Sequence, residues 1–504
     1  MINLFSSLIA YVSREIYLYY VPYIGNMEQW AKDWLEEQHK VGEKCLEIKV
    51  RGNCHYVYHS TSRYDKEIKK GRKVSVYLGR LDKEHGFMPK GEKPEANTTL
   101  TPRSVTDYGN SMILRNALAE IKPLLMDSFP DYWEELYAMS IVRVNGYTPL
   151  KRIKDSWEDL YDPEGLNPNL NPSNLSKVLR EVGLDRFGQN EVFSHLKSLD
   201  TQLIYDLSTC FSRSMNILQA EKGYNKDCIQ VPQVNFALLC GLDSEMPTMI
   251  KSVPGSVRDI STLYKTIEEL DISDKVLLLD RGFFSENVLK FLEEKHIKFV
   301  LPTKRNSHYY DTRIHLNEEF MYHDRLIKCG KRKSGNIFLY LYEDQDLKLE
   351  ELKTIFRRRE EGKIKDEDYS LKQTKAGKFL IISNYDIGKK EMYELYKRRD
   401  SIEKLFDAYK TTLEADKLYL HDDESVYGHV FVAFLSLYAY CKILKALKKA
   451  DINDKFSPTD ILLKFRKVKN IDFGERNIIT EVPKKVRDLD KTLNFNIFPT
   501  KNGS

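Results

Sequence analysis

The sequence predicts an α/β protein in which a mixed sheet flanked by helices is interrupted by a β-rich insertion and preceded by a β meander and a helical region. From residue 201 onward, apolar strand-like runs alternate with helical patterns. Residues 303–375 break that alternation with short strands among charge clusters. Hydrophobic residues make up 41% of the chain, enough to bury a core.

Length and charge set the first limits on function. The 504 residues suggest about three domains. The formal net charge is only +4, from 79 Lys and Arg against 75 Asp and Glu. This excludes a histone-like basic protein, but it leaves DNA binding open because a basic face can coexist with acidic ones.

Cysteine usage and apolar runs bear on location. The seven cysteines are dispersed, with no C-x-x-C pair and no zinc spacing, which is typical of reduced thiols in a cytoplasmic protein. Residues 1–24 are apolar but interrupted by Arg14 and Glu15, so we expect a short packed helix rather than a signal peptide or membrane span. The run at 430–444 is shorter than a bilayer requires, which favours a buried helix and no membrane partner.

Six regions follow from the changes in pattern. They are an N-terminal β-rich region expected to contact DNA ends (1–100), a helical region (101–200), the first part of the core (201–302), the β-rich insertion (303–375), the second part of the core (376–450) and a C-terminal tail for DNA contact or dimerisation (451–504).

The order of elements in the core is specific. Three apolar strands come first, at "TQLIYDLS", "VPQVNFALLCGL" and "MPTMIKSV", followed by helix, strand, helix and strand. This is the order of an RNase H-like sheet.

Two of these strands are predicted to end in an aspartate. Asp206 closes "QLIYD" and Asp280 closes "VLLLD". A carboxylate at the end of an apolar strand is held on a rigid element at the sheet edge, where sites on open α/β sheets lie. A helix N-cap or a turn aspartate is the alternative for each.

One long amphipathic helix is predicted over residues 389–413. Tyr396, Arg399, Glu403 and Lys410 fall within a wedge of about 60° on its wheel. An apolar stripe flanks this wedge and would hold it against the sheet, with the members Ile402, Phe406, Tyr409 and Leu413. An ordinary ion-pair face, with Arg399 and Glu403 four residues apart, is the alternative.

Three carboxylates from two strands and one helix suit a hard divalent cation. Asp206, Asp280 and Glu403 would bind Mg²⁺ or Mn²⁺, two ions per site, for in-line phosphoryl transfer. Neighbouring Arg and Lys side chains would bind a phosphodiester backbone.

The sequence resembles the DDE transposases of bacterial and archaeal insertion sequences, in the group called insertion sequence four. The hallmark Y-(2)-R-(3)-E-(6)-K is complete in "YKRRDSIEKLFDAYK", residues 396–410. The resemblance covers about residues 40–450. Other stretches that fit are "YDLST", "GYNKD", "PGSVRD", "LLLDRGFFS" and "GHVFVAFLSL". Ser208 and Ser256 stand where the family more often has Thr and Asn, and neither change removes a ligand.

The resemblance implies a cut-and-paste endonuclease and strand-transfer enzyme. Asp206, Asp280 and Glu403 would bind the ions, while Tyr396, Arg399 and Lys410 would hold the terminal phosphates of double-stranded DNA. The resemblance leaves open whether the freed 3′-hydroxyl first attacks the opposite strand to form a DNA hairpin before the ends join target DNA. A homodimer on the inverted-repeat ends and a prokaryotic, nucleoid-associated location are also implied.

Three other classes remain open. A catalytically inactive or domesticated transposase would bind DNA without cutting it. A stand-alone RNase H-like nuclease would cut without joining ends to target. A tyrosine recombinase would need no metal and an H-x-x-R box, and "HDR" at 323–325 is one residue short of that box.

Overall fold

The computed structural model divides the chain into two compact units, Met1–Thr101 and Pro102–Ser504. It describes residues 27–65, 70–91, 101–212, 216–223, 231–256, 259–416, 420–474 and 476–498. The helix predicted for residues 1–24 lies outside the described residues, as do most of "GYNKD" and part of "PGSVRD".

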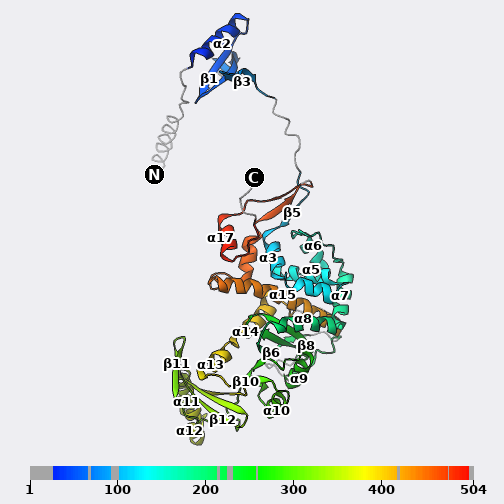
Figure 1. Ribbon diagram of the computed structural model, residues 1–504, viewed down its shortest axis with the longest axis vertical. Helices are drawn as coiled ribbons and strands as arrows, with labels where there is room; N and C mark the ends of the chain where they lie inside the picture. The colour runs from blue at the N-terminus through cyan, green and yellow to red at the C-terminus, as the bar shows by residue number, and fades with distance from the viewer. Residues whose placement is uncertain are drawn as a thin grey trace. The chain divides into compact units, whose positions relative to one another are not determined.

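The smaller unit contains the expected meander and one helix that the sequence analysis did not predict. Its elements are α2 (Gln29–Lys40), β1 (Leu46–Arg51), β2 (Cys54–Asp65), β3 (Lys70–Asp82) and β4 (Gly86–Pro89). The strands form an antiparallel sheet in chain order. Ala31 of the helix packs with Ile48, Val57 and Leu81 of the strands, so α2 covers one face of the sheet (Figure 1).

The larger unit begins with a short strand and a set of packed helices. They are β5 (Ser104–Asp107), α3 (Gly109–Ala117), α4 (Ile121–Ser128), α5 (Trp133–Asn145), η1 (Leu150–Arg152), α6 (Ile153–Glu158), α7 (Pro172–Leu184) and α8 (Arg186–Ser198). Asn171 is the N-cap of α7, because its side chain accepts the Ser173 backbone N–H.

A nine-stranded mixed sheet forms the centre of this unit. The core elements are β6 (Gln202–Phe211), β7 (Gln233–Gly241), β8 (Pro247–Pro254), α9 (Asp259–Leu270), β9 (Val276–Leu279), η2 (Arg281–Phe283), α10 (Glu286–Glu294), β10 (Lys298–Pro302) and β14 (Lys378–Ser383). β6, β7 and β8 pair antiparallel, while β9 runs parallel to both β6 and β10. Helices contact the sheet at β6, β8 and β10. The predicted mixed sheet flanked by helices is confirmed.

The segment between β10 and β14 extends this sheet. It supplies β11 (Glu318–Tyr322), β12 (Arg325–Ser334) and β13 (Ile337–Asp344), and β13 pairs antiparallel with β14. It also supplies the helices α11 (Gln345–Glu360) and α12 (Asp366–Lys375), which lie beside these strands in Figure 1. Neither helix has a fully buried residue. Both therefore lack the continuous apolar face by which a packed helix is recognised in a sequence.

The longest helix is α15 (Asp423–Lys449), which runs through the core beside α5 and α7. The prediction that residues 430–444 belong to a buried helix is correct. The argument that this helix is too short to cross a bilayer was wrong. Among the described residues this one helix, 27 residues long, has the length and hydropathy to cross a membrane. Its most apolar window is nevertheless 72% buried inside the protein. Polar residues at both ends hid the helix's full length in the sequence.

His429 on α15 predicts a specific dependence of stability on pH. Its Nε2 lies 3.1 Å from the Ala415 carbonyl oxygen, which accepts the N–H, and its Nδ1 lies 3.2 Å from the Arg143 guanidinium. Burial, and then the Arg143 charge, lower the pKa of His429 from 6.5 to about 3. Below pH 6.5, His429 therefore binds a proton in the unfolded chain but not in the folded chain. The free energy of unfolding consequently falls as the pH falls.

Between about pH 7 and about pH 5, we expect His429→Gln to lose about 2 kcal/mol less stability than the wild type loses. Urea unfolding at the two pH values measures this difference. An identical loss in the variant and the wild type would contradict the assignment.

The C-terminal region, whose sequence has no clear motif, contains helices and strands between residues 458 and 492. It forms α16 (Pro458–Phe465), β15 (Lys469–Asp472), β16 (Asn477–Ile479) and α17 (Lys484–Thr492). β15 pairs antiparallel with β5, so the two ends of the larger unit meet in one small sheet. The buried Asp107 carboxylate forms ion pairs with Arg466, at 2.6 Å, and with Lys469. Two basic residues of the tail that we expected to contact DNA or to dimerise therefore have a structural partner.

Candidate active site

The two aspartates lie side by side on neighbouring parallel strands. The ladder between β6 and β9 ends at the pair Tyr205 and Leu279, so Asp206 and Asp280 occupy the next position on each strand. Adjacent strands are about 4.8 Å apart, and side chains at matching positions project from the same face. The placement of Asp206 at a strand end was wrong. β6 continues to Phe211 because its other neighbour, β7, pairs with it over that whole length.

Asp280 follows β9 directly, and its carboxylate makes two contacts. Its Oδ2 accepts the Gly282 backbone N–H at 3.2 Å and caps the short helix η2. Its Oδ1 forms an ion pair with the Arg399 guanidinium. The N-cap role that we considered as an alternative is therefore real, and it coexists with a contact to the predicted site.

Arg399 links two of the three predicted carboxylates. One of its terminal nitrogens contacts Asp280, and the other lies 3.3 Å from Oε1 of Glu403. The separation between the carboxylates of Glu403 and Asp280 is therefore limited to the width of one guanidinium group plus its two contacts. The Arg399 side chain is 23% exposed and that of Glu403 62%, so the ion pair to Glu403 is open to solvent.

The single helix predicted over 389–413 is wrong. The chain forms α13 (Lys389–Lys397), α14 (Asp400–Asp407) and a π-helical turn, η3 (Ala408–Thr412). At the junction, the Arg399 N–H bonds to the Tyr396 carbonyl at 3.1 Å and the Ile402 N–H to the Arg399 carbonyl at 3.0 Å. These i to i−3 bonds tighten the helix, and the π turn widens it. A single helical wheel with 3.6 residues per turn therefore does not describe the positions of all four signature residues.

Tyr396 lies against the guanidinium of Arg399. The Arg399 carbon is 5.7 Å from the centre of the tyrosine ring, and the ring of Phe379 is 5.9 Å away. Burial, and then the negative charge of Asp400, raise the pKa of Tyr396. Its phenol therefore stays protonated at neutral pH and can donate a hydrogen bond.

Lys410 contacts the same strand as Asp206. Its Nζ donates to the Thr209 backbone carbonyl at 2.7 Å, and the side chain is half-buried. This bond attaches η3 to β6. Lys410 therefore has a structural partner at a point three residues beyond Asp206.

The donor set has the chemistry of a Mg²⁺ or Mn²⁺ site because all three side chains are carboxylates. Among the residues that the structure describes, however, no three histidine, cysteine or acidic side chains are gathered closely enough to hold a metal ion. At Asp280 and Glu403, the guanidinium of Arg399 lies between the two carboxylates and balances their charge.

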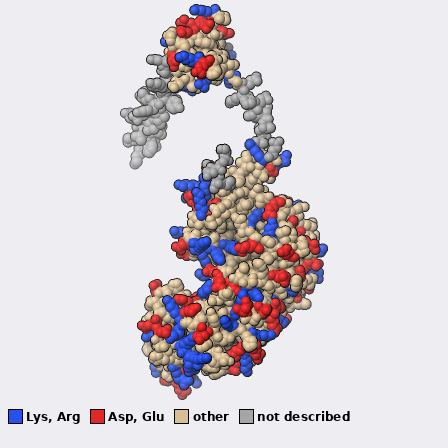
Figure 2. Space-filling view, viewed as in Figure 1, with Lys and Arg blue, Asp and Glu red and all other residues tan. Residues whose placement is uncertain are grey.

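A basic cleft lies next to this junction and was not predicted. Its volume is about 440 Å³, and it is formed where α13 and α14 face the C-terminal half of α15. Its lining includes five basic residues (Lys397, Arg398, Lys404, Lys445 and Lys448) and three acidic ones (Glu245, Asp400 and Asp454). Lys448 forms an ion pair with Glu245 at 2.5 Å. The runs "KRR" and "KALKK" are visible in the sequence, but only the fold brings them together. Basic and acidic side chains are otherwise interspersed on the visible face of the larger unit (Figure 2).

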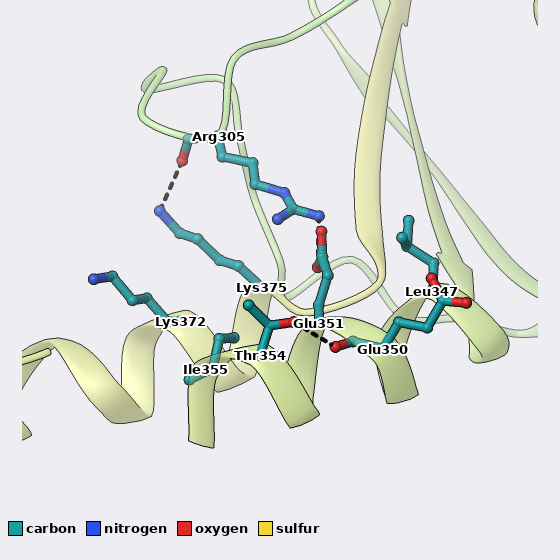
Figure 3. Close-up of a pocket in the computed structure, with 8 residues that line it drawn as sticks. All are labelled: Arg305, Leu347, Glu350, Glu351, Thr354, Ile355, Lys372 and Lys375. Atoms are coloured by element: carbon teal, nitrogen blue, oxygen red, sulfur yellow. Dashed lines mark hydrogen bonds and ion pairs between the residues drawn. The ribbon is translucent and has the colours of Figure 1, made fainter. Parts of the chain in front are cut away.

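Another cavity, of about 480 Å³, lies between α11, α12 and the loop that carries Arg305 (Figure 3). Three of its charged side chains have partners within the lining. Arg305 contacts Glu351 at 3.0 Å, and Lys375 donates to the Arg305 carbonyl. None of the six predicted site residues lines this cavity.

The comparison with family models finds a match over part of the larger unit. Residues 206–439 match the family model described as the transposase DDE domain, and this match begins at Asp206. It supports a DDE transposase, a class of polynucleotidyl transferases and nucleases that generally use divalent metals and act on DNA.

Solved structures and curated proteins add little to this match. A cryo-EM structure of a piggyBac transposase synaptic complex with hairpin DNA is similar at a TM-score of 0.35 and 12% identity, over 79% of this chain and 87% of that chain. No curated protein matches the sequence.

Proposed function

We propose that the protein is a cut-and-paste DNA transposase of the insertion-sequence-four group. The observation that carries the proposal is the adjacency of Asp206 and Asp280 on paired parallel strands, with Glu403 joined to Asp280 through Arg399. The two aspartates, the glutamate and the arginine come from three separate elements, and an ordinary ion-pair face of one helix does not require that convergence.

An RNase H-like core is part of this proposal. The strand order β8-β7-β6-β9-β10, with three antiparallel strands followed by two that run parallel to β6, supports it. In such a sheet, side chains beyond the ends of parallel strands meet at one edge, where a site can form.

Asp206, Asp280 and Glu403 would hold two Mg²⁺ or Mn²⁺ ions. When bound, the ions activate a water or a 3′-hydroxyl and stabilise the leaving oxygen of in-line phosphoryl transfer. Arg399 would exchange its carboxylate partners for a DNA phosphate, which a guanidinium can bind in a bidentate manner. Tyr396 would donate its phenolic hydrogen to the same backbone.

The DNA partners would be the inverted-repeat ends of the element and its target. The basic cleft beside α14 offers further phosphate contacts next to the carboxylates. Nicking, a hairpin intermediate and strand transfer by a homodimer complete the proposed reaction, in a prokaryotic cytoplasm at the nucleoid. The six cysteines described by the structure are free thiols, which is compatible with that compartment.

The test is a nicking and strand-transfer assay on a labelled duplex that carries the inverted repeats flanking the gene. We expect nicks that require Mg²⁺ or Mn²⁺, followed by joining to target DNA. Nicking without joining would favour the stand-alone nuclease, and metal-independent cutting would favour a tyrosine recombinase.

A DNA-binding protein without catalysis is the second candidate. The observation in its favour is that Arg399 already neutralises Asp280 and Glu403 in this structure. Tight binding of the inverted repeats with no nicking under any divalent ion would decide for it.

Lys410→Ala tests the role of the last signature residue. We expect weaker binding of the inverted-repeat duplex and a salt slope shallower by about one unit, because one phosphate contact is lost. Electrophoretic mobility shifts across a salt series measure the slope. Lys265→Ala, an exposed lysine on α9, is the control. An unchanged slope in Lys410→Ala would mean that Lys410 only attaches η3 to β6.

A further inference from the structure

The hairpin of β2 and β3 in the smaller unit extends beyond its neighbouring strands. β1 pairs with β2 no farther than His59, and β4 pairs with β3 only from Gly79 onward. Residues 61–65 and 70–74 therefore pair only with each other among the described strands. We call these two segments the ribbon. It has two open faces and no partner from the unit's core.

Two arginines face each other across the ribbon. Arg63 is in register with Arg72, and both side chains are exposed. Like charges directly opposite each other destabilise an antiparallel pair. Neither arginine has an ion-pair partner within the described part of the chain. The ribbon therefore carries an unfavourable charge pair that a polyanion would relieve.

Cations project from both faces of the ribbon. Arg63 and Arg72 lie on one face, and Lys73, opposite Ser62, lies on the other. Lys73 reaches the Glu47 carboxylate on β1, at 2.7 Å, so part of its charge is already balanced. Exposed apolar surface accompanies the charge, since Tyr64 is 65% exposed and Val74 is 40% exposed. Cations on two faces suit a ligand that surrounds the ribbon.

Net charge also differs between the parts of the smaller unit. The first three strands have a net charge of +4, from seven basic residues (Lys49, Arg51, Arg63, Lys70, Arg72, Lys73 and Arg80) against Glu47, Asp65 and Asp82. The helix α2 has a net charge of −1, from Asp33, Glu36 and Glu37 against Lys32 and Lys40. A polyanion is therefore attracted to the strands rather than to the helix.

We propose that the ribbon inserts into a groove of double-stranded DNA, with Arg63 and Arg72 contacting its phosphates. The major groove of B-DNA is wide enough for a two-stranded β-ribbon, and phosphates line both of its walls. Tyr64 and Val74 supply apolar contacts to sugars and thymine methyl groups. This inference takes its DNA partner from the proposed function, but it does not depend on catalysis by the larger unit.

The test compares two double variants of the full chain. Arg63→Gln with Arg72→Gln changes the ribbon, and Lys32→Gln with Lys40→Gln removes two exposed charges from α2 as a matched control. The probe is a mixed-sequence duplex, and its binding is followed by fluorescence anisotropy across a salt series. We expect the ribbon variant to lower the salt slope by about two units, and the control to leave it unchanged. Equal slopes in the two variants would overturn the proposal.

Thermal unfolding separates a binding role from a structural one. Because the substitutions remove a repulsion, the ribbon variant should unfold at the same or a higher temperature than the wild type at low salt. A lower unfolding temperature would mean that the arginines support the fold, which overturns the proposal. Tighter binding of the matching single strand than of the duplex would also overturn it.

The outcome is independent of the nicking assay. Ribbon-dependent duplex binding without nicking would leave this inference standing and remove the proposed transposase activity. Nicking by a ribbon variant with unchanged DNA binding would remove the inference and leave the activity.

Discussion

Asp280→Asn is expected to lower strand nicking by at least about a hundredfold while binding of the inverted-repeat duplex persists. The substitution keeps the size of the side chain and its acceptor for the Gly282 N–H. It removes the negative charge that pairs with Arg399 and that would hold a divalent ion. Initial nicking rates and binding isotherms, measured on the same duplex, separate the two effects.

Asp274→Asn is the matched control, because Asp274 precedes the same strand, β9, at its opposite end. Its side chain is 66% exposed and contacts only Lys275 among the ion pairs of the described residues. We expect wild-type nicking from it. Full nicking activity in Asp280→Asn would falsify the proposed carboxylate triad.

Gly428→Ala is expected to destabilise the larger unit by an amount on the order of 3 kcal/mol. At this position α15 crosses α7 so closely that a Cβ on Gly428 would overlap the backbone carbonyl of Leu179. Gly183 of α7 meets the backbone of α15 in the same way, at Glu424. Because backbone atoms cannot rotate away as side chains do, the two helices would have to separate. Chemical unfolding followed by circular dichroism measures the loss.

Gly388→Ala provides the comparison. Gly388 precedes α13, and the nearest atoms to an added Cβ are 3.8 Å away. We expect a change of no more than about 1 kcal/mol there, from the weaker N-cap. Similar losses in the two variants would show that the α7–α15 crossing is not closely packed.

Most of the strands were predictable because their signals are local. "QLIYD", "VLLLD" and "GKFLIISN" are short apolar runs, and a buried strand needs no information from elsewhere in the chain. The helix at 389–413 was only partly predictable. Its amphipathic period is visible in the sequence, but the tight turn at Arg399 and the π turn at 408–412 depend on where α13 and α14 rest on the sheet.

The sequence by itself determined the α/β class, the order of the core strands and the identity of the signature residues. These follow from periodicity and from residue types at set spacings, which the chain carries without reference to its neighbours. Only the tertiary structure decided that Asp206 lies beside Asp280, that Arg399 joins Asp280 to Glu403, and that two basic runs share one cleft. Each is a contact between residues that are distant in the chain. Strand register and helix packing set these contacts, and no local sequence pattern specifies either of them.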